Sequence, residues 1–174
     1  DVEGRGLKNT GGYIFYDGQN AQWLDPAKPK AREYVCALAK EIAILGFDEV
    51  ILTDLSYPTL GKVDKIAYGD APKEDNLTLL LQELHRAMSD ETVVISIELS
   101  PEVILGEDKG VSGLSLDLVL PYVDRIYAKT DPDQAASLAA AVGHRAAALN
   151  CKTVFVPELT EHTDAISGSR LVLN

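Results

Sequence analysis

The sequence is poor in the residues that form metal sites and in long apolar runs. It contains 2 cysteines, 3 histidines and 1 methionine among 174 residues. Cys36 and Cys151 stand far apart, without a CxxC motif or a Cys/His cluster, so we expect no zinc site and no other bound metal. We interpret both as buried free thiols, with a disulfide between them as the alternative. No apolar run is long enough to span a bilayer, which predicts no membrane insertion.

Positive charge is also scarce in this chain. There are 16 Lys and Arg residues against 27 Asp and Glu residues, which gives a formal net charge of -11. Nucleic acids and anionic membranes require a basic surface, so the composition excludes both as partners. The charge fits a neutral or weakly cationic ligand. Neither a GxGxxG nor a Walker A sequence is present, so no nucleotide or other cofactor is predicted.

The start of the chain lacks two familiar features. It does not begin with methionine, and no cationic, apolar signal segment opens it. We therefore expect an N-terminus that was processed or cut. This leaves the location unknown, and an extracellular or cell-surface location stays among the alternatives. The length and the 46% hydrophobic content predict one folded domain over residues 1–174.

Short apolar runs alternate with helical patterns along the whole chain. Helices are predicted at 26–45, 77–88 and 132–149, with Asp25 and Asp131 as N-caps, each followed by proline. Strands are predicted at residues 13–16, 50–52, 92–97, 123–128, 153–156 and 171–173. Strands that alternate with helices predict a parallel sheet with right-handed crossovers.

Five of the predicted strands end at an ionisable residue. These residues are Asp17, Asp54, Glu98, Lys129 and Glu158. The carboxyl ends of parallel strands meet at one edge of a sheet, and (β/α)-barrels keep their chemistry there, so we expect one ligand-facing rim. The missing Gly-rich first turn favours a TIM-type barrel over an open doubly wound sheet.

Residues 23–58 carry several short motifs at characteristic spacing. They are Trp23-Leu24-Asp25-Pro26, Arg32-Glu33-Tyr34, Ala39-Lys40-Glu41, Gly46-Phe47-Asp48-Glu49-Val50, Asp54 and Tyr57-Pro58. This set resembles a family of bacterial (β/α)8-barrel proteins that are classed as glycoside hydrolases, related to the α-amylase-like clan and often described only as a domain of unknown function. The resemblance is specific over this stretch and diffuse beyond it.

The resemblance implies a particular count of strands. If the strand before Asp54 is the fourth, as in amylase-like barrels, then 13–16 is the third and 171–173 is the eighth. The chain would then hold about six βα units, with the first two missing, and would be the C-terminal part of a larger barrel. A homodimer or a missing N-terminal segment would complete such a partial barrel, because open sheet edges must be paired or covered.

The resemblance also implies a reaction and a site. Hydrolysis of a poly- or oligosaccharide needs two carboxyl groups, and neighbouring parallel strands lie about 4.8 Å apart. We therefore assign Asp54 as the nucleophile and Glu98 as the acid/base. Ser56 stands roughly where the family has an arginine beside the acid. This departure motivates a second hypothesis, a degenerate barrel that binds carbohydrate without cleaving it.

The remaining candidates each have an alternative structural role. Asp17 and Glu158 could contact sugar hydroxyls or could cap loops. Trp23 and Tyr57 could stack on sugar rings or could pack under the loops. Lys129 could contact substrate, could form a Schiff base in a lyase, which is a third hypothesis, or could pair with an acid.

Other ionisable residues near the strand ends are not assigned to this site. Asp48 and Glu49 precede the strand that leads to Asp54, so we expect them at the opposite, stabilising end of the barrel. His162 follows the Glu158 strand, but no Ser/Asp pattern accompanies it that would make a catalytic triad.

Overall fold

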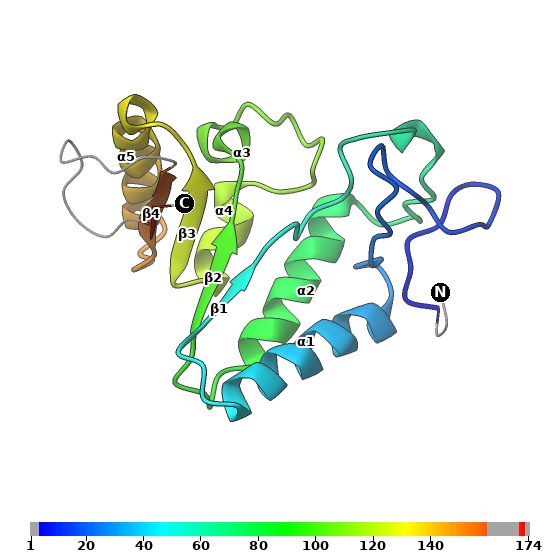
Figure 1. Cartoon of the computed structure of the whole chain (residues 1–174), viewed down its shortest axis with the longest axis horizontal. Coiled ribbons are helices and arrows are strands. Elements are labelled where there is room, and N and C mark those ends of the chain that lie inside the picture. The colour runs from blue at the N-terminus through cyan, green and yellow to red at the C-terminus, as the bar shows by residue number, and fades with distance from the viewer. Residues whose placement is uncertain (1–3, 160–170, 173–174) are drawn as a thin grey trace. The chain divides into compact units, whose positions relative to one another are not determined.

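The computed structural model describes residues 4–159 and 171–172 of the chain. The fold divides into two compact units (Figure 1). Unit 1 contains residues 1–47, 56–91 and 110–114, and unit 2 contains residues 48–55, 92–109 and 115–174. The chain passes between the units several times, so neither is a continuous stretch of sequence.

Unit 1 is built on two packed helices, α1 (Pro29–Ile44) and α2 (Lys73–Ala87), with a short 3-10 helix at Val63–Lys65. Figure 1 shows α1 and α2 lying side by side. A partly buried ion pair joins them, because Arg32 Nε lies 3.0 Å from Glu83 Oε2. The inner face of α2 is apolar and fully covered, and it consists of Leu77, Leu80, Leu81 and Leu84.

The predicted strand at 13–16 is wrong. These residues form isolated antiparallel bridges, Lys8 to Ile14 and Tyr16 to Gln22, and are not part of the sheet. The Asn9 side chain accepts hydrogen bonds from the backbone N–H groups of Gly11 and Tyr13 and turns the chain back on itself. The β-prone run therefore pairs with its near neighbours in sequence.

The predicted start of the first helix is also wrong, by three residues. Asp25 caps a turn, because its side chain accepts from the N–H of Ala27 and its carbonyl accepts from the N–H of Lys28. The helix begins afterwards, at Pro29. The end of the helix agrees with the prediction from the sequence, since Gly46 has φ +87, the left-handed conformation that closes a helix.

Unit 2 is a parallel sheet with helices, as the sequence predicts. The strands are β1 (Glu49–Leu52), β2 (Val94–Glu98), β3 (Arg125–Lys129), β4 (Val154–Leu159) and β5 (Leu171–Val172), and they pair in chain order. The connections contain α3 (Pro101–Leu105), α4 (Leu116–Val119), a 3-10 helix (Leu120–Tyr122) and α5 (Pro132–Ala148). β4 continues through Pro157 to Leu159, so the predicted stop at the proline is wrong.

The strand register separates the sheet into two faces. Successive side chains point to opposite faces, and register partners point to the same one. One face, the apolar face, is buried and consists of Val50, Ile95, Ile97, Ile126, Ala128 and Leu159. The other, the polar face, carries Glu49, Ser96, Glu98, Arg125, Tyr127, Lys129 and Glu158.

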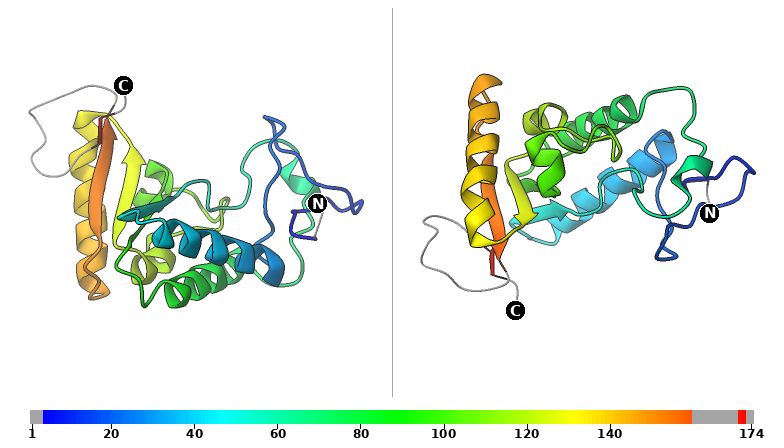
Figure 2. Two further views of the ribbon diagram at one scale, coloured as in Figure 1. Left: turned by 60° about the horizontal axis from the view of Figure 1, so that its bottom comes forward. Right: turned by 90° about the horizontal axis from the view of Figure 1, so that it is seen from above.

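α5 packs against β4 and buries Leu138 and Val142 (Figure 2). Its predicted cap is confirmed, because the Asp131 side chain accepts from the N–H of Gln134 at 2.8 Å. This helix therefore starts where the Asp-Pro pair indicated. Among the residues that the structure describes, no helix is both long and apolar enough to cross a bilayer.

Candidate functional site

The polar face of unit 2 brings three predicted residues together at its carboxyl edge. Glu98 ends β2, Lys129 ends β3, and Glu158 lies near the end of β4. The Lys129 ammonium lies 2.8 Å from Glu98 Oε1, and Lys129 and Glu158 are direct register partners. These three predicted residues therefore lie at one edge of the sheet, the carboxyl edge.

The carboxylates at this rim affect the pKa of Lys129. The hydrogen bond from Lys129 to Glu98 raises the pKa of the ammonium, and the charges of Glu158 and Asp54 add to the effect. The fourth predicted residue, Asp54, thus lies within electrostatic reach of the same cation. A raised pKa keeps Lys129 protonated, which argues against the Schiff-base hypothesis, since that chemistry needs a neutral amine.

Glu158 has an unusual environment for a carboxylic acid. The residue is only 6% exposed. Within the described part of the chain, no hydrogen bond or ion pair joins its carboxyl group to another residue. Burial raises the pKa of Glu158, the charge of Glu98 raises it further, and Lys129 offsets part of the rise. The ionised form of Glu158 is therefore less favourable than that of an exposed glutamate.

Asp54 follows β1 in a conformation that few residues adopt. Its φ is +52, in the left-handed region, where aspartate and asparagine are tolerated better than other residues with a Cβ. The side chain is exposed. Backbone strain of this kind persists where the surrounding structure holds it, and it clusters at functional sites.

A second polar cluster lies closer to the start of the strands, and the sequence did not predict it. Glu49 Oε1 accepts hydrogen bonds from Ser96 Oγ at 2.5 Å and from the Tyr127 hydroxyl at 2.9 Å, and Glu49 Oε2 lies 2.8 Å from Arg125 Nη1. Burial raises the pKa of Tyr127, and the bond to Glu49 adds to this. The signal that could have revealed the cluster is the alternation of polar residues along β2 and β3.

The other predicted residues belong to unit 1. The Trp23 indole Nε1 donates to Asp17 Oδ2 at 3.0 Å, and Asp17 Oδ1 accepts from the N–H groups of Gln19 and Ala21. These bonds, that from Ala21 first and that from Trp23 next, lower the pKa of Asp17. Asp17 therefore serves as the cap of a loop, and Trp23 is half-buried beside it.

Tyr57 is a core residue of unit 1. Its ring is fully buried and makes an edge contact with Tyr68 at 5.3 Å between ring centroids. Its hydroxyl accepts from Asn76 Nδ2 at 3.1 Å, and burial raises the pKa of Tyr57 to about 12. A buried ring offers no face to a sugar, so the packing role is the one that the structure supports.

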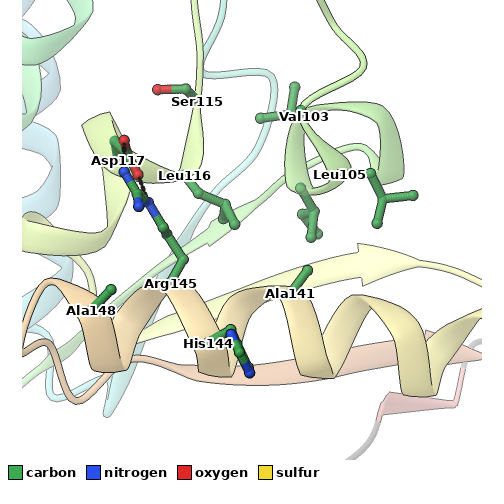
Figure 3. Close-up of a pocket in the computed structure, with 11 residues that line it drawn as sticks. Val103, Leu105, Ser115, Leu116, Asp117, Ala141, His144, Arg145 and Ala148 are labelled. Carbon is green, nitrogen blue, oxygen red and sulfur yellow. Dashed lines mark hydrogen bonds and ion pairs between the residues drawn. The ribbon is translucent and has the colours of Figure 1, made fainter.

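Unit 2 also holds a cavity of about 460 Å³ between α3, α4 and α5 (Figure 3). Figure 3 shows Leu105 and Leu116 pointing toward α5, and the Asp117–Arg145 ion pair at one side. None of the seven predicted site residues lines this cavity. Its walls are mostly apolar, and its one charged pair is already satisfied internally.

The remaining sequence predictions concern metals and cysteines. Over the described ranges, no group of three or more His, Cys, Asp or Glu side chains is placed to hold a metal ion. Cys36 and Cys151 are both free thiols. His162 lies outside the residues that the structure describes.

Solved structures share this fold. The chain is similar to the PgaB (BpsB) glycoside hydrolase domain of Bordetella bronchiseptica, with a TM-score of 0.56 and 17% identity over 89% of this chain and 55% of that one. It is also similar to the C-terminal domain of a "putative chitinase" from Desulfitobacterium hafniense, with a TM-score of 0.50 and 14% identity over 77% of this chain and 41% of that one. The chain thus spans about half the length of these structures.

Among curated proteins, none matches the chain significantly. The family evidence comes from the sequence model described as "Putative glycosyl hydrolase domain", which matches residues 3–140. That range includes the whole stretch from Trp23 to Pro58 and the strand ends of β1, β2 and β3. The chain belongs to this glycosyl hydrolase family.

Proposed function

We propose that the chain is the catalytic part of a glycoside hydrolase that acts on a poly- or oligosaccharide. One observation carries the proposal: at the carboxyl edge of a parallel sheet, the Lys129 ammonium at the end of β3 forms an ion pair of 2.8 Å with Glu98 at the end of β2, and Glu158 on β4 is its register partner. This is the edge at which (β/α)-barrel enzymes hold their catalytic residues. Family membership and the similar folds of glycoside hydrolases support the same reaction class.

We further propose that the sheet is part of a (β/α)-barrel. Its strands pair in chain order and are all parallel, and the apolar face is buried. The polar face leaves Ile51 39% exposed and Val154 53% exposed. In a closed barrel this face would point inward, and further strands would cover it. A homodimer or an N-terminal segment that supplies those strands stays part of this proposal.

Within this enzyme we assign Asp54 as the nucleophile and Glu98 as the acid/base. Glu98 ends β2, and Asp54 lies just beyond the end of the neighbouring strand β1, so a strand spacing of about 4.8 Å is compatible with the roughly 5 Å carboxyl separation of retaining glycosidases. Asp54 would form a bond to the anomeric carbon as the glycosidic C–O bond breaks. Glu98 would give its proton to the leaving oxygen and later remove one from water.

We assign supporting roles to three other residues. Lys129 lies on β3 between Glu98 and Glu158, and we assign Lys129 and Glu158 as substrate contacts at this edge of the polar face. In unit 1, Trp23 is a candidate sugar contact, because its indole is half-buried and Asp17 fixes its orientation through a hydrogen bond. An aromatic ring held in this way suits the apolar face of a sugar.

Replacement of Asp54 by asparagine tests the central assignment. Asparagine tolerates the same left-handed backbone, so Asp54→Asn removes the charge without adding strain. We expect sugar release from a panel of polysaccharides, measured as new reducing ends, to fall by about three orders of magnitude or more. Asp48→Asn, an exposed residue just before β1, is the matched control and should behave as wild type. Undiminished release by Asp54→Asn would refute the assignment.

The non-catalytic hypothesis has one specific observation in its favour. Ser56 stands near the position where the family has an arginine, and an arginine there would hold the catalytic carboxylate ionised and oriented. Affinity electrophoresis in gels that contain the same polysaccharides separates the two functions. Retardation of the wild-type chain without any release of reducing ends would favour binding alone.

A further inference from the structure

Glu98 has two cations within reach on the neighbouring strand. Its register partner on β3 is Tyr127, so Arg125 and Lys129 stand two residues to either side of that partner, on the same polar face. Long side chains on adjacent strands reach across such diagonals. Lys129 does so, since its ammonium lies 2.8 Å from Glu98 Oε1, and an arginine side chain is no shorter than that of lysine. The register therefore permits either pairing.

Arg125 is held instead by a carboxylate from β1. Its Nη1 lies 2.8 Å from Glu49 Oε2. The other oxygen of Glu49 accepts hydrogen bonds from Ser96 Oγ at 2.5 Å and from the Tyr127 hydroxyl at 2.9 Å. Ser96 is fully buried and Tyr127 is 6% exposed, so the hydroxyl side of this group is enclosed. Both carboxylate oxygens are thus occupied, and three donors fix the orientation of Glu49.

Tyr127 separates the two ion pairs. Its side chain starts beside Glu98, and its hydroxyl bonds to the same oxygen as Ser96 Oγ, so the ring runs from the level of Glu98 toward that of Ser96. Arg125 lies on the side of the strand starts, and Lys129 lies at the strand ends. A pairing of Glu98 with Arg125 would therefore draw its carboxyl group away from the rim.

We propose that Glu49 is a positioning residue of the site. By holding Arg125, it leaves Lys129 as the cation that pairs with Glu98, and so keeps the Glu98 carboxyl group at the rim. Glu49 starts β1, at the far end from the rim, so it acts through Arg125 and not on substrate. The consequence for catalysis rests on the proposed glycosidase function, whereas the choice of ion pair does not.

Glu49→Gln tests the choice of ion pair without any substrate. Glutamine has the same shape and keeps one oxygen for the two hydroxyl donors, but it turns an NH2 group toward Arg125, so that two donors face each other. Arg125 should then leave and take Glu98, and Lys129 should lose its partner. The hydrogen bond to Glu98 is the largest cause of the raised pKa of Lys129, so this pKa should fall toward its ordinary value.

A titration of the full chain, labelled with 13C at the lysine Cε atoms, measures the pKa of Lys129. Its signal is identified by its absence in Lys129→Met. The charges of Glu158 and Asp54 also act on this ammonium, and both residues are unchanged in every variant compared. A fall in the pKa of Lys129 therefore reports the loss of Glu98.

The double variant Glu49→Gln/Arg125→Gln separates positioning from general damage to the fold. With the competing cation removed, Glu98 should return to Lys129, and the titration should return to that of the wild type. Arg125→Gln alone should also leave the Lys129 titration unchanged. Damage to the fold would instead be at least as large in the double variant as in Glu49→Gln.

A control and a second variant complete this test. Glu102→Gln, at an exposed glutamate in α3, should leave the Lys129 titration unchanged. Glu49→Asp shortens the side chain that reaches Arg125 across β2, so it should release the arginine in the same way if the glutamine variant does not fold. A Lys129 titration that ignores the loss of Glu49, or that the double variant fails to restore, would overturn the proposal whether or not the chain is a glycosidase.

Leaving-group dependence tests the consequence for catalysis. With 4-nitrophenyl and 2,4-dinitrophenyl glycosides as probes, Glu49→Gln should lower kcat/KM on the poorer leaving group by about 100-fold, because the acid Glu98 is displaced. The loss on the dinitrophenyl glycoside should be small, since that group departs without a proton, and the double variant should recover. Equal losses on both substrates, or no recovery, would overturn the positioning role. A wild-type chain that hydrolyses no glycoside would instead refute the proposed function, and the titration would still identify the partner of Glu98.

Discussion

Gly113 and Gly143 show how differently one residue type is used in this chain. Gly113 has φ +80, and a Cβ built on it would lie 2.8 Å from Lys73 Cβ and 3.0 Å from Leu77 Cδ1. Gly143 lies on the exposed side of α5, with no atom near the position of a Cβ. The first glycine is required by backbone and space, whereas the second only weakens its helix.

Alanine substitutions at these two glycines should therefore have opposite signs. Gly113→Ala should lower the free energy of unfolding by more than about 1 kcal/mol, through a strained φ and a close contact. Gly143→Ala should raise it by up to about 1 kcal/mol, because alanine is the better helix former. Urea denaturation followed by circular dichroism measures both. A stabilising Gly113→Ala would contradict the geometry around that residue.

The residues of the rim were predictable because their positions follow from a local rule. A polar residue at the end of an apolar run predicts the carboxyl edge of a strand, and this rule found Glu98, Lys129 and Glu158. Pairing of Lys129 with an acid was one of the alternatives that the sequence offered, but only the register between strands shows that Glu98 is the acid that forms the ion pair. The sequence suggests Tyr57 as a site residue because it follows Asp54, but its ring is fully buried and contacts Tyr68.

The first turn of α5 contains the predicted N-cap Asp131, whose contribution to stability can be measured by mutation. The Asp131 side chain caps the helix through the N–H of Gln134, and Asp133 lies in the same turn without capping a backbone group. Asp131→Ala should cost about 1 kcal/mol of stability. Asp133→Asn removes only a favourable charge near the helix start and should cost a few tenths of that. Thermal unfolding of both variants compares them, and equal losses would contradict the capping role.

The errors at the level of elements have a common physical cause. The pair Asp25-Pro26 has the chemistry of a helix start, but it also suits a turn, and the buried Asp25 forms that turn three residues early. Residues 13–16 are β-prone, but the Asn9 side chain, which accepts from the N–H groups of Gly11 and Tyr13, turns the chain so that they pair locally. Pro157 fits inside β4, where it is the register partner of Ala128. In the first two cases local hydrogen bonds decide between two structures that the sequence permits, and in the third the pairing of β4 with β3 decides.

Because the chain forms two units, different spectroscopic signals report on different parts of it during unfolding. The single tryptophan of the sequence, Trp23, lies in unit 1, so its fluorescence reports on that unit. Circular dichroism reports on the helices of both units. The catalytic candidates Asp54, Glu98 and Glu158 all lie in unit 2, so activity and fluorescence report on different parts of the molecule.

The buried Tyr57 makes the stability of unit 1 sensitive to alkaline pH. Its pKa is about 12 in the folded chain and about 10 when unfolded. Between these values the unfolded state binds fewer protons, so unfolding becomes more favourable as the pH rises. The contribution is fully present below pH 10 and is lost as the pH approaches 12. Its size is on the order of 2 kcal/mol.

Urea unfolding followed by Trp23 fluorescence from pH 8 to pH 12 checks this dependence. Tyr57→Phe removes the titrating group and one hydrogen bond to Asn76, so it should be about 1 kcal/mol less stable at pH 8. Above pH 10 it should lose stability less steeply than wild type, because no buried phenol remains to ionise. Tyr13→Phe, at an exposed tyrosine, should follow the wild-type curve. Parallel curves for wild type and Tyr57→Phe would mean that Tyr57 ionises without unfolding unit 1, and its burial would then be incomplete in solution.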